Sequence, residues 1–249
     1  MVVGASSGLG RCIGIGLAKR GAHVALLARR KARLDAAAEE AGASALAIEC
    51  DVTDERSGRS AIDEAARGLG GIDALVYTPA IGPLGRLVDT DADAWRRVFD
   101  TNVTGAARIT AAAVPHLEAT AGTAAFLSSV SASQTRPWPG LGPYIVSKAA
   151  LDKLVEAWRA EHPGIGFTRL VVGDCAGGEG DSRTEFAETW DPDLAAELVP
   201  GWLERGFLSG SLIAVDELVS VVDAVLRGGA SLSMPSVTVT PRAGIKEQS

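Results

Sequence analysis

Hydrophobic residues occur along the chain in short runs that alternate with longer stretches of amphipathic pattern. The runs predict β-strands at 23–28, 45–49, 74–77, 124–128 and 166–172, with a weaker one at 236–240. The amphipathic stretches predict helices at 9–20, 32–41, 56–69, 92–117, 144–160 and 216–226. Because the strand runs show little alternation with polar residues, they are typical of a parallel sheet that helices cover on both faces.

This order of elements predicts an α/β fold with a doubly wound parallel sheet, the Rossmann arrangement, in a single domain spanning residues 1–249. Ligands of such sheets bind at the carboxyl ends of the strands. One segment, at about 174–205, interrupts the alternation and contains glycine, glutamate and tryptophan residues. We predict that it is an irregular binding loop or substrate lid.

Composition narrows the class of protein. The 249 residues are 47% hydrophobic and 22% charged, which is enough apolar material for a sizeable core, and the formal net charge is −7. No Lys/Arg-rich run is present, so neither nucleic acid nor a membrane is an expected partner. Three scattered cysteines fit a reducing, cytoplasmic location, and the three histidines show no metal-ligand spacing, so no metal site is expected.

A glycine-rich segment reading GASSGLG lies between the apolar Val2–Val3 and the first predicted helix. Glycines in this pattern allow a tight turn and a close approach of the backbone to a phosphate, and the free N–H groups of the following helix favour a pyrophosphate. The alternative is an ordinary turn. The predicted cofactor contacts in this segment are Gly4, Ser6, Ser7, Gly8, Leu9 and Gly10.

The ends of the second and third predicted strands bear on the choice of cofactor. The second ends in Ala28-Arg29-Arg30, where an acidic residue would bind the ribose 2′-hydroxyl of NAD. Arginines there suit a 2′-phosphate, so we predict NADP(H), with NAD(H) possible, although the arginines also fit a solvated start of a helix. Asp51 follows the third strand and either binds an adenine amino group or caps the next helix with Thr53 or Asp54.

Tyr144 and Lys148 lie four residues apart, and therefore on one face of a predicted helix. An ammonium stabilises a phenolate, so we expect it to lower the pKa of Tyr144 toward working pH and to let this residue transfer a proton at a carbonyl or alcohol oxygen. The alternative is a surface Tyr–Lys pair. Ser129 lies at the carboxyl end of a predicted strand, where its hydroxyl would orient a substrate carbonyl, although serine clusters also form turns.

Together these motifs resemble the short-chain dehydrogenase/reductase family in its compact branch of about this length. The resemblance rests on Gly4-x3-Gly8-x-Gly10, Asp51, Asn102 in DTNVTG, Ser129 in LSSVS and Tyr144-x3-Lys148. It implies a catalytic tetrad of Asn102, Ser129, Tyr144 and Lys148. In it Tyr144 is the general acid/base, Ser129 holds the substrate oxygen, Lys148 binds the nicotinamide ribose, and Asn102 holds a relay water through a local break in its helix. Ser131 is the reserve for the serine.

The resemblance also implies cofactor contacts from Val52, Ala80 and Gly173, and it exposes departures from the family pattern. The first strand is truncated to the few residues before Gly4. The family's NNAG segment is replaced by Tyr77-Thr78-Pro79-Ala80, and its Pro-Gly after the sixth strand by Gly173-Asp174. These changes put the tightness of cofactor binding and catalytic competence in question.

The predicted function is an NADP(H)-dependent oxidoreductase that interconverts a carbonyl and a secondary alcohol. The alternative is a non-catalytic nucleotide-binding or regulatory protein with the same fold; an epimerase or dehydratase would need further C-terminal residues. Tryptophans at 138, 190 and 202 favour a small apolar or ring-bearing substrate, unless they merely pack onto the body. Residues 174–204 hold nine acids and one base, which disfavours polyanionic substrates. The resemblance implies a homodimer or homotetramer.

Overall fold

A single parallel sheet of seven strands forms the centre of the computed structural model, which describes residues 1–242; residues 243–249 of the predicted domain lie outside that part. The strand order is β3-β2-β1-β4-β5-β6-β7. From β1 in the middle the chain winds first to β3 at one edge and then to β7 at the other, which confirms the doubly wound prediction. The strands are β1 (Val2–Val3), β2 (Val24–Ala28), β3 (Ala45–Glu49), β4 (Ala74–Tyr77), β5 (Thr123–Ser129), β6 (Gly166–Val172) and β7 (Ser236–Val239).

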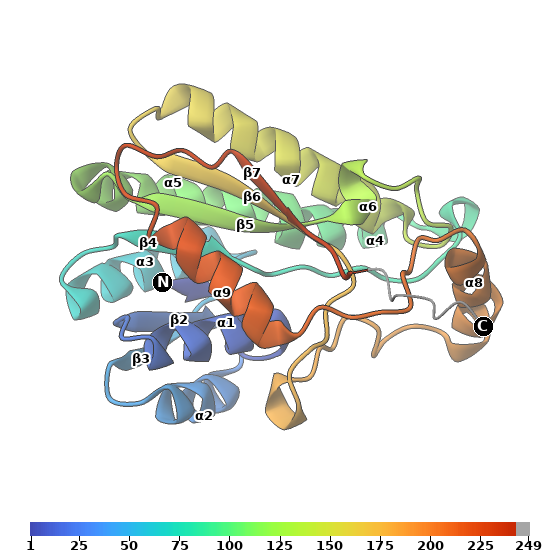
Figure 1. Cartoon of the computed structure of the whole chain (residues 1–249), viewed down its shortest axis with the longest axis horizontal. Helices are drawn as coiled ribbons and strands as arrows, with labels where there is room; N and C mark the ends of the chain where they lie inside the picture. The colour runs from blue at the N-terminus through green and yellow to red at the C-terminus, as the bar shows by residue number, and fades with distance from the viewer. Residues whose placement is uncertain (243–249) are drawn as a thin grey trace.

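Helices cover both faces of the sheet (Figure 1). One face carries α1 (Gly8–Lys19), α2 (Lys31–Ala41) and α9 (Val215–Leu226), and the other carries α3 (Glu55–Leu69), α5 (Gly105–Thr120) and α7 (Gly142–Glu161). Each face buries its own apolar cluster against the sheet. Because the inner strands are buried on both sides, their sequences are almost continuously apolar, which explains why the pattern predicted them well, whereas the edge strand β7 has exposed residues and gave a weaker signal.

The first strand is short, as the sequence predicts, but it lies at the centre of the sheet. Its residues Val2 and Val3 are fully buried and pair with β2 on one side and β4 on the other. Backbone bonds extend this pairing beyond the strand, since Gly4 N and Ala5 N both donate to Leu27 O, at 2.7 and 3.1 Å. Two residues are therefore enough to connect the two halves of the sheet and to place the glycine-rich turn at its carboxyl edge.

The helix predicted as one element at 92–117 is interrupted. It consists of α4 (Ala92–Phe99), a π-helical turn at Asp100–Thr104 and α5. The hydroxyl of Tyr77 donates to the carbonyl of Thr101 at 2.5 Å, and this bond holds the turn against the end of β4. The local break that the family resemblance implies at Asn102 is therefore present, while the hydrophobic pattern across it continues with helical spacing and does not reveal it.

The prediction of an irregular segment at 174–205 is wrong in its second half, where α8 (Pro192–Glu204) forms. Asp191 caps this helix by accepting a bond from Leu194 N at 2.9 Å, and Pro192 occupies its first turn. Pro200 inside the helix and the mixture of acidic and aromatic residues obscured the helical pattern. Three short elements also lie outside the predicted set, namely α6 (Val130–Ser133) and the 3₁₀ turns at Leu87–Asp89 and Gly180–Ser182.

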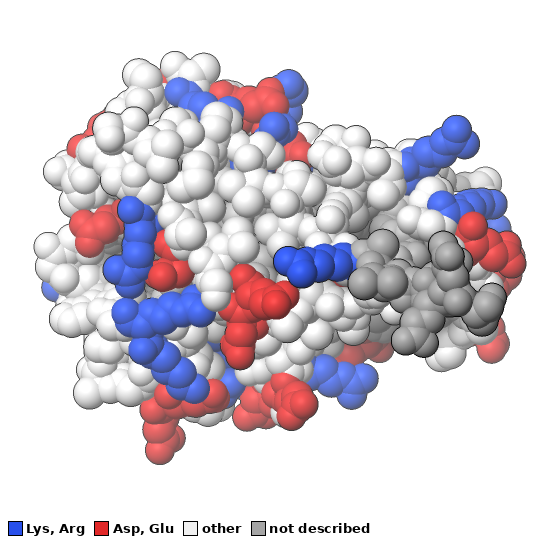
Figure 2. Space-filling view, in the orientation of Figure 1, with Lys and Arg blue, Asp and Glu red and all other residues white. Residues whose placement is uncertain are grey.

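Charges of both signs are interspersed on the face shown in Figure 2, especially over α1, α2 and α9, whereas the surface along β6 and β7 carries few of them. Within residues 1–242, no helix is long and apolar enough to cross a membrane. The same residues hold no cluster of three or more potential ligands for a metal ion.

Candidate active site

The glycine-rich turn brings the start of α1 close to the end of β1. Gly4 and Gly8 have φ of +85° and +55°, a backbone conformation that favours glycine. At Gly10, an added Cβ would overlap the carbonyl oxygen of Gly4 and the hydroxyl of Thr78. Because no side chain fills this space, the first N–H groups of α1 lie at the carboxyl edge of the sheet, which suits a pyrophosphate. Leu9 lies half-buried on α1, packed against the core.

Arg30, at the start of α2, points back to this turn. Its guanidinium donates to the hydroxyl of Ser6 at 2.9 Å and to that of Ser7 at 2.7 Å. Ser7 is the N-cap residue of α1 but makes no side-chain capping bond, and Arg30 binds its hydroxyl instead. Arg29 is exposed and makes no hydrogen bond or ion pair within the described residues. Of the two predicted arginines, Arg30 is therefore the one next to the turn.

Arg33, which sequence analysis did not select as a site residue, joins this basic group. It lies one helical turn after Arg30, and both arginines form ion pairs with Glu185. The spacing of three residues at the start of a helix is the signal that could have found it. The chemistry of the donors therefore fits the predicted cofactor, since two guanidiniums and the hydroxyls of Ser6 and Ser7 lie at the glycine-rich turn.

The remaining predicted cofactor contacts lie at the ends of neighbouring strands. Asp51, after β3, accepts bonds from the N–H and the hydroxyl of Thr53, at 2.9 and 2.7 Å. Burial opposes ionisation of Asp51, but these bonds and the charge of Arg29 lower its pKa overall. Asp54, rather than Asp51, caps α3. Val52 is buried directly after Asp51.

Ala80 and Gly173 lie just after β4 and β6, at the same edge of the sheet, and both are half-buried. Gly173 N donates to Val239 O at 2.9 Å and so extends the pairing of β6 with β7. The following Asp174 accepts bonds from the N–H and the hydroxyl of Ser209, at 2.7 and 3.0 Å. The Gly173-Asp174 pair replaces the family's Pro-Gly. It therefore connects the start of the segment at 174–205, the acidic segment, to Ser209 just beyond its end.

The four predicted catalytic residues come from three elements that converge beside the turn. Tyr144 and Lys148 lie on α7, with the Lys148 ammonium 5.8 Å from the centre of the Tyr144 ring. Ser129 ends β5, and its hydroxyl lies 2.9 Å from that of Ser131. Of the two serines, Ser129 is the one that acts on the pKa of Tyr144, which it lowers. This effect favours Ser129 over the reserve Ser131 as the serine beside the tyrosine.

Asn102 is fully buried in the π-helical turn. Its amide oxygen accepts a bond from Ile81 N, and its amide nitrogen donates to Ile81 O and to the hydroxyl of Ser147, each at 2.9 Å. The side chain thus connects the loop after β4 with α7, one residue before Lys148.

Residues 77–80, which replace the family's NNAG segment, support the π-helical turn that carries Asn102. Tyr77 is fully buried and binds the carbonyl of Thr101, as described above. Thr78 donates its hydroxyl to Val3 O at 2.6 Å and so holds the loop against the centre of the sheet. A Cβ on Gly105 would lie 2.8 Å from the Tyr77 hydroxyl, so this glycine makes room for the tyrosine. The departure from the family pattern therefore supplies its own support for the turn that carries Asn102.

Burial determines the protonation of the two α7 residues. It raises the pKa of the Tyr144 phenol to about 12, against a smaller lowering by the hydrogen bond with Ser129. It lowers the pKa of the Lys148 ammonium to about 8, although the carboxylate of Asp152 acts in the opposite direction. Lys148 donates to Leu127 O at 2.6 Å and stays beside the tyrosine ring rather than at its hydroxyl. The expectation that Lys148 lowers the pKa of Tyr144 is therefore not met in this structure.

The acidic segment covers the site with aromatic side chains. Phe186 contacts Tyr144 edge to face, with 4.9 Å between the ring centres, and Trp190 donates its indole N–H to Gly82 O at 2.8 Å. Trp202 is buried and lies 5.4 Å from Trp138, ring centre to ring centre. The tryptophans thus pack with one another and onto the loop before α7, the alternative that sequence analysis left open.

Cys175, in the segment after β6, behaves as a structural thiol. Burial raises its pKa to about 11, and its sulfur lies within 3.5 Å of the carbonyl oxygens of Ala176 and Ile213. A thiol with a raised pKa is a poor nucleophile at neutral pH.

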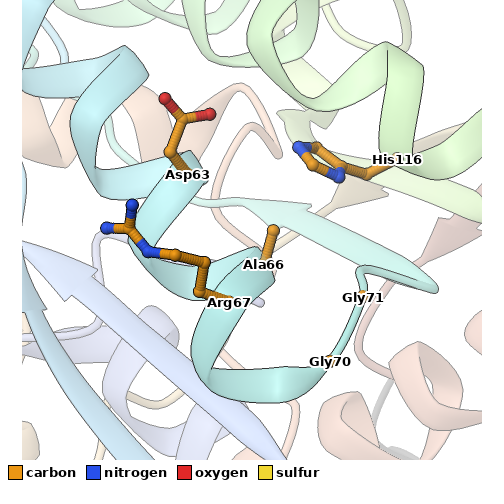
Figure 3. Close-up of a pocket in the computed structure, with 6 residues that line it drawn as sticks. All are labelled: Asp63, Ala66, Arg67, Gly70, Gly71 and His116. Carbon is orange, nitrogen blue, oxygen red and sulfur yellow. The ribbon is translucent and has the colours of Figure 1, made fainter.

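A surface hollow away from this site is lined by residues of α3, its carboxyl end and α5 (Figure 3). In Figure 3 the side chains of Asp63 and His116 project from α3 and α5, above the loop that holds Gly70 and Gly71. This loop leads into the amino end of β4, so the hollow lies at the edge of the sheet opposite the glycine-rich turn. It contributes nothing to the candidate active site.

Comparisons with known proteins identify the family. Residues 1–177 match the family model described as short chain dehydrogenase, and the chain belongs to the short-chain dehydrogenase/reductase family. It is 36% identical over 178 residues to a short chain dehydrogenase of Pseudocercospora fijiensis; the match covers 69% of this chain and 57% of that protein. The chain thus spans little more than half the length of this relative.

Solved structures confirm the fold. A short-chain type dehydrogenase/reductase from Mycobacterium marinum is similar with a TM-score of 0.81 and 26% identity, covering 96% of this chain and 92% of that one. A 3-ketoacyl-(acyl-carrier-protein) reductase from Brucella melitensis, complexed with NADH, has a TM-score of 0.80 and 24% identity, covering 98% and 96%. The predicted family and the Rossmann arrangement are both confirmed.

Proposed function

We propose that this chain is an NADP(H)-dependent oxidoreductase that interconverts a carbonyl and a secondary alcohol, with Tyr144 as the general acid/base. The observation that carries this proposal is the convergence of Tyr144, Ser129 and Lys148 at the edge of the sheet where the glycine-rich turn lies. A bound nicotinamide supplies or accepts the hydride. The residues of the chain then have to position the substrate oxygen and move its proton.

Each side chain has a distinct part in this proposal. The Ser129 hydroxyl binds the substrate oxygen and orients it toward the Tyr144 hydroxyl, which donates a proton to a carbonyl or removes one from an alcohol. Lys148 binds the nicotinamide ribose. Asn102 fixes the loop at Ile81 through two of its three amide bonds, and its π-helical turn provides a place for a relay water.

The raised pKa of Tyr144 indicates that the site works in a different state from the one described here. Phe186 covers the Tyr144 ring, and burial favours the neutral phenol. Movement of Phe186 away from the ring would expose the Tyr144 phenol further and reduce the penalty on the phenolate.

The proposed preference for NADP(H) rests on Arg30 and Arg33. The end of β2 provides no carboxylate for a ribose 2′-hydroxyl, whereas the two guanidiniums suit the bidentate geometry of a phosphate. The Brucella melitensis reductase is complexed with NADH, so fold similarity favours a nicotinamide cofactor without selecting NADP(H). Tighter binding of NADH than of NADPH would contradict the preference.

The proposed substrate is small and apolar or ring-bearing, because aromatic side chains line the segment 174–205, which we propose to be the substrate lid. The nine acids of this lid disfavour polyanionic substrates by like-charge repulsion. We also propose that the chain assembles as a homodimer or homotetramer, as its family resemblance implies.

The decisive experiment is Tyr144→Phe, which removes the proposed acid/base while keeping the ring. We expect turnover of a carbonyl panel with NADPH to fall by about a thousandfold, with NADPH affinity nearly unchanged in a fluorescence titration. Unchanged turnover would refute the mechanism. The neighbouring serines give a matched pair, since Ser129→Ala should lose most activity and Ser131→Ala much less.

The contact of Phe186 with Tyr144 favours a second candidate, a nucleotide-binding protein that performs no chemistry. In such a protein the lid stays closed and the phenol stays protonated. Tight NADPH binding without turnover of any tested carbonyl, together with no effect of Tyr144→Phe on binding, would favour this candidate.

A further inference from the structure

The lid runs directly across the proposed cofactor site. Near its start, Thr184 packs on the glycine-rich turn, where a Cβ on Gly8 would lie 3.5 Å from the Thr184 Cα. Two residues later, Phe186 lies on Tyr144, and a Cβ on Gly82 would overlap its ring. The stretch from Thr184 to Phe186 therefore connects the phosphate end of the site with its catalytic end.

Glu185, between these two residues, lies in the basic group. One of its carboxylate oxygens pairs with Arg30 and the other with Arg33. Arg30 keeps its bonds to Ser6 and Ser7 at the same time. The two guanidiniums beside the glycine-rich turn therefore already bind an anion, the carboxylate of Glu185.

The charge of Glu185 is well supported in this position. Burial opposes its ionisation, but the hydrogen bonds from Arg30 and Arg33 and their charges lower the pKa of its carboxyl group overall. The Glu185 side chain is 25% exposed, so solvent screens the two ion pairs only in part. A 2′-phosphate that approached the same guanidiniums would meet this carboxylate as a like charge.

We propose that Glu185 is a specificity-determining residue for the cofactor: its carboxylate occupies the arginines that bind a 2′-phosphate, and the phosphate must displace it. This inference rests on the proposed function. Because Phe186 is the next residue, displacement of Glu185 draws Phe186 away from Tyr144. A cofactor with a 2′-phosphate therefore opens the lid as it binds, whereas one without it gains nothing from the displacement.

The connections of the lid allow such a movement. The two ends of the lid are tied to each other, because Asp174 and Cys175 at its start contact Ser209 and Ile213 just beyond its end. Between these ends, the polar side-chain contacts of the stretch at 182–186 with the body are those of Ser182 and Glu185, beside the packing of Thr184 and Phe186. Release of Glu185 therefore removes the ion pairs of this stretch without breaking the sheet.

The test compares adenosine 2′,5′-bisphosphate, which carries the 2′-phosphate, with AMP, which lacks it. Calorimetric titrations of the full chain would measure both affinities for the wild type and for Glu185→Gln. We expect the bisphosphate to bind about five- to tenfold more tightly to the variant, the effect of losing two partly exposed ion pairs. The affinity for AMP should change less than about twofold.

The matched control is Glu188→Gln, which removes an exposed acid from the same lid that forms no ion pair within the described residues. It should leave both affinities nearly unchanged. An equal gain in this variant would show a general effect of charge and would overturn the role of Glu185. An unchanged bisphosphate affinity in both Glu185→Gln and Glu185→Ala would overturn it as well.

A second readout follows the lid itself. Arg183 is exposed and adjoins the stretch that has to move, so trypsin cleavage after it reports opening. We expect the bisphosphate to accelerate this cleavage and AMP to leave it unchanged; protection by both nucleotides would contradict the proposal. Failure of the wild type to bind either nucleotide would refute the proposed function and, with it, this inference, whereas binding without a gain in the variants would refute the inference alone.

Discussion

The sheet with its covering helices and the acidic lid are stabilised in different ways. In the body, two extensive apolar clusters fill the space between the sheet and the helices on either face. In the lid, Trp202 is the buried residue of a small cluster whose other buried members, Leu141 and Ile145, belong to the body. Side-chain contacts at the surface, such as the ion pair of Arg86 with Glu197, supplement this cluster.

The difference in stabilisation determines which region of the molecule can rearrange. Burial of apolar area contributes about 25 cal/mol per Å², so the body gains stability from many side chains at once. Exposed ion pairs contribute about 0–1 kcal/mol each, so contacts such as those of Glu185 can be exchanged at little cost. The body can therefore keep the glycine-rich turn and the tetrad in place while the lid rearranges over them.

The largest expected effect is a loss of stability when a buried aromatic side chain is truncated, and its size should differ between the body and the lid. Phe126 is fully buried at the centre of β5, between Tyr77 and Phe167. Phe126→Ala should lower the free energy of unfolding by about 3–5 kcal/mol in denaturant titrations. Trp202→Ala removes a larger side chain but only from the lid cluster. Trp202→Ala should lower the free energy of global unfolding by less than about 1.5 kcal/mol, while making the lid much more sensitive to protease.

Equal losses of global stability in these two variants would break the comparison. They would mean that the lid unfolds together with the body as one cooperative unit. Opening of the lid by a cofactor would then carry a far larger free-energy cost than the exchange of ion pairs.

An effect of intermediate size is expected when a glycine of the body or of the lid is replaced by alanine. Gly10→Ala forces a Cβ against the carbonyl oxygen of Gly4 and should cost about 3 kcal/mol or more, since the Gly4 backbone and the Thr78 side chain both have to shift. Gly201 lies in α8 with no atom within 4 Å of an added Cβ. Gly201→Ala should therefore be neutral or stabilising by up to about 1 kcal/mol through helix propensity. Thermal unfolding of both variants, with NADPH affinity as a second measurement, checks the pair; a stable Gly10→Ala variant with normal affinity would contradict the proposed close approach.

The sequence predicted the body well because its signals are local. Apolar runs identify strands buried on both faces, and the spacing of Gly4, Gly8 and Gly10 identifies a turn that excludes side chains. Tyr144 and Lys148 are linked by helical spacing alone. Each of these inferences needs only residues close together in the chain.

The features that were missed depend on distant contacts. Glu185 meets Arg30 and Arg33 across about 150 positions of sequence, and no periodicity links them. The prediction for the pKa of Tyr144 failed for the same reason, since it took account of Lys148 on the same helix and not of burial beneath Phe186. Helix α8 was missed because Pro200 and the acidic residues around it weaken the local pattern.

The smallest predicted effect concerns Lys148, the one buried lysine among residues 1–242. Lys148 is 2% exposed and its pKa is lowered to about 8 by burial, against about 10.4 in an unfolded chain. Below pH 8 the folded state has to hold this charge; between pH 8 and 10.4 it releases the proton before the unfolded state does, so stability from this group rises with pH across that window. Lys148→Met removes the charge and its bond to Leu127 O, while Asp152 keeps the charge of Arg169 nearby.

We therefore expect Lys148→Met to lose turnover and yet to be more stable than the wild type at pH 7, by about 1 kcal/mol. The gain should disappear as the pH approaches 10, because the wild-type lysine is then neutral in the folded state. Denaturant titrations at pH 7 and pH 10 measure it, with Lys153→Met on the exposed side of α7 as the control that should show no such dependence on pH. A variant that is less stable than the wild type at both pH values would mean that the ammonium strengthens the fold, and that the body holds its catalytic lysine without cost.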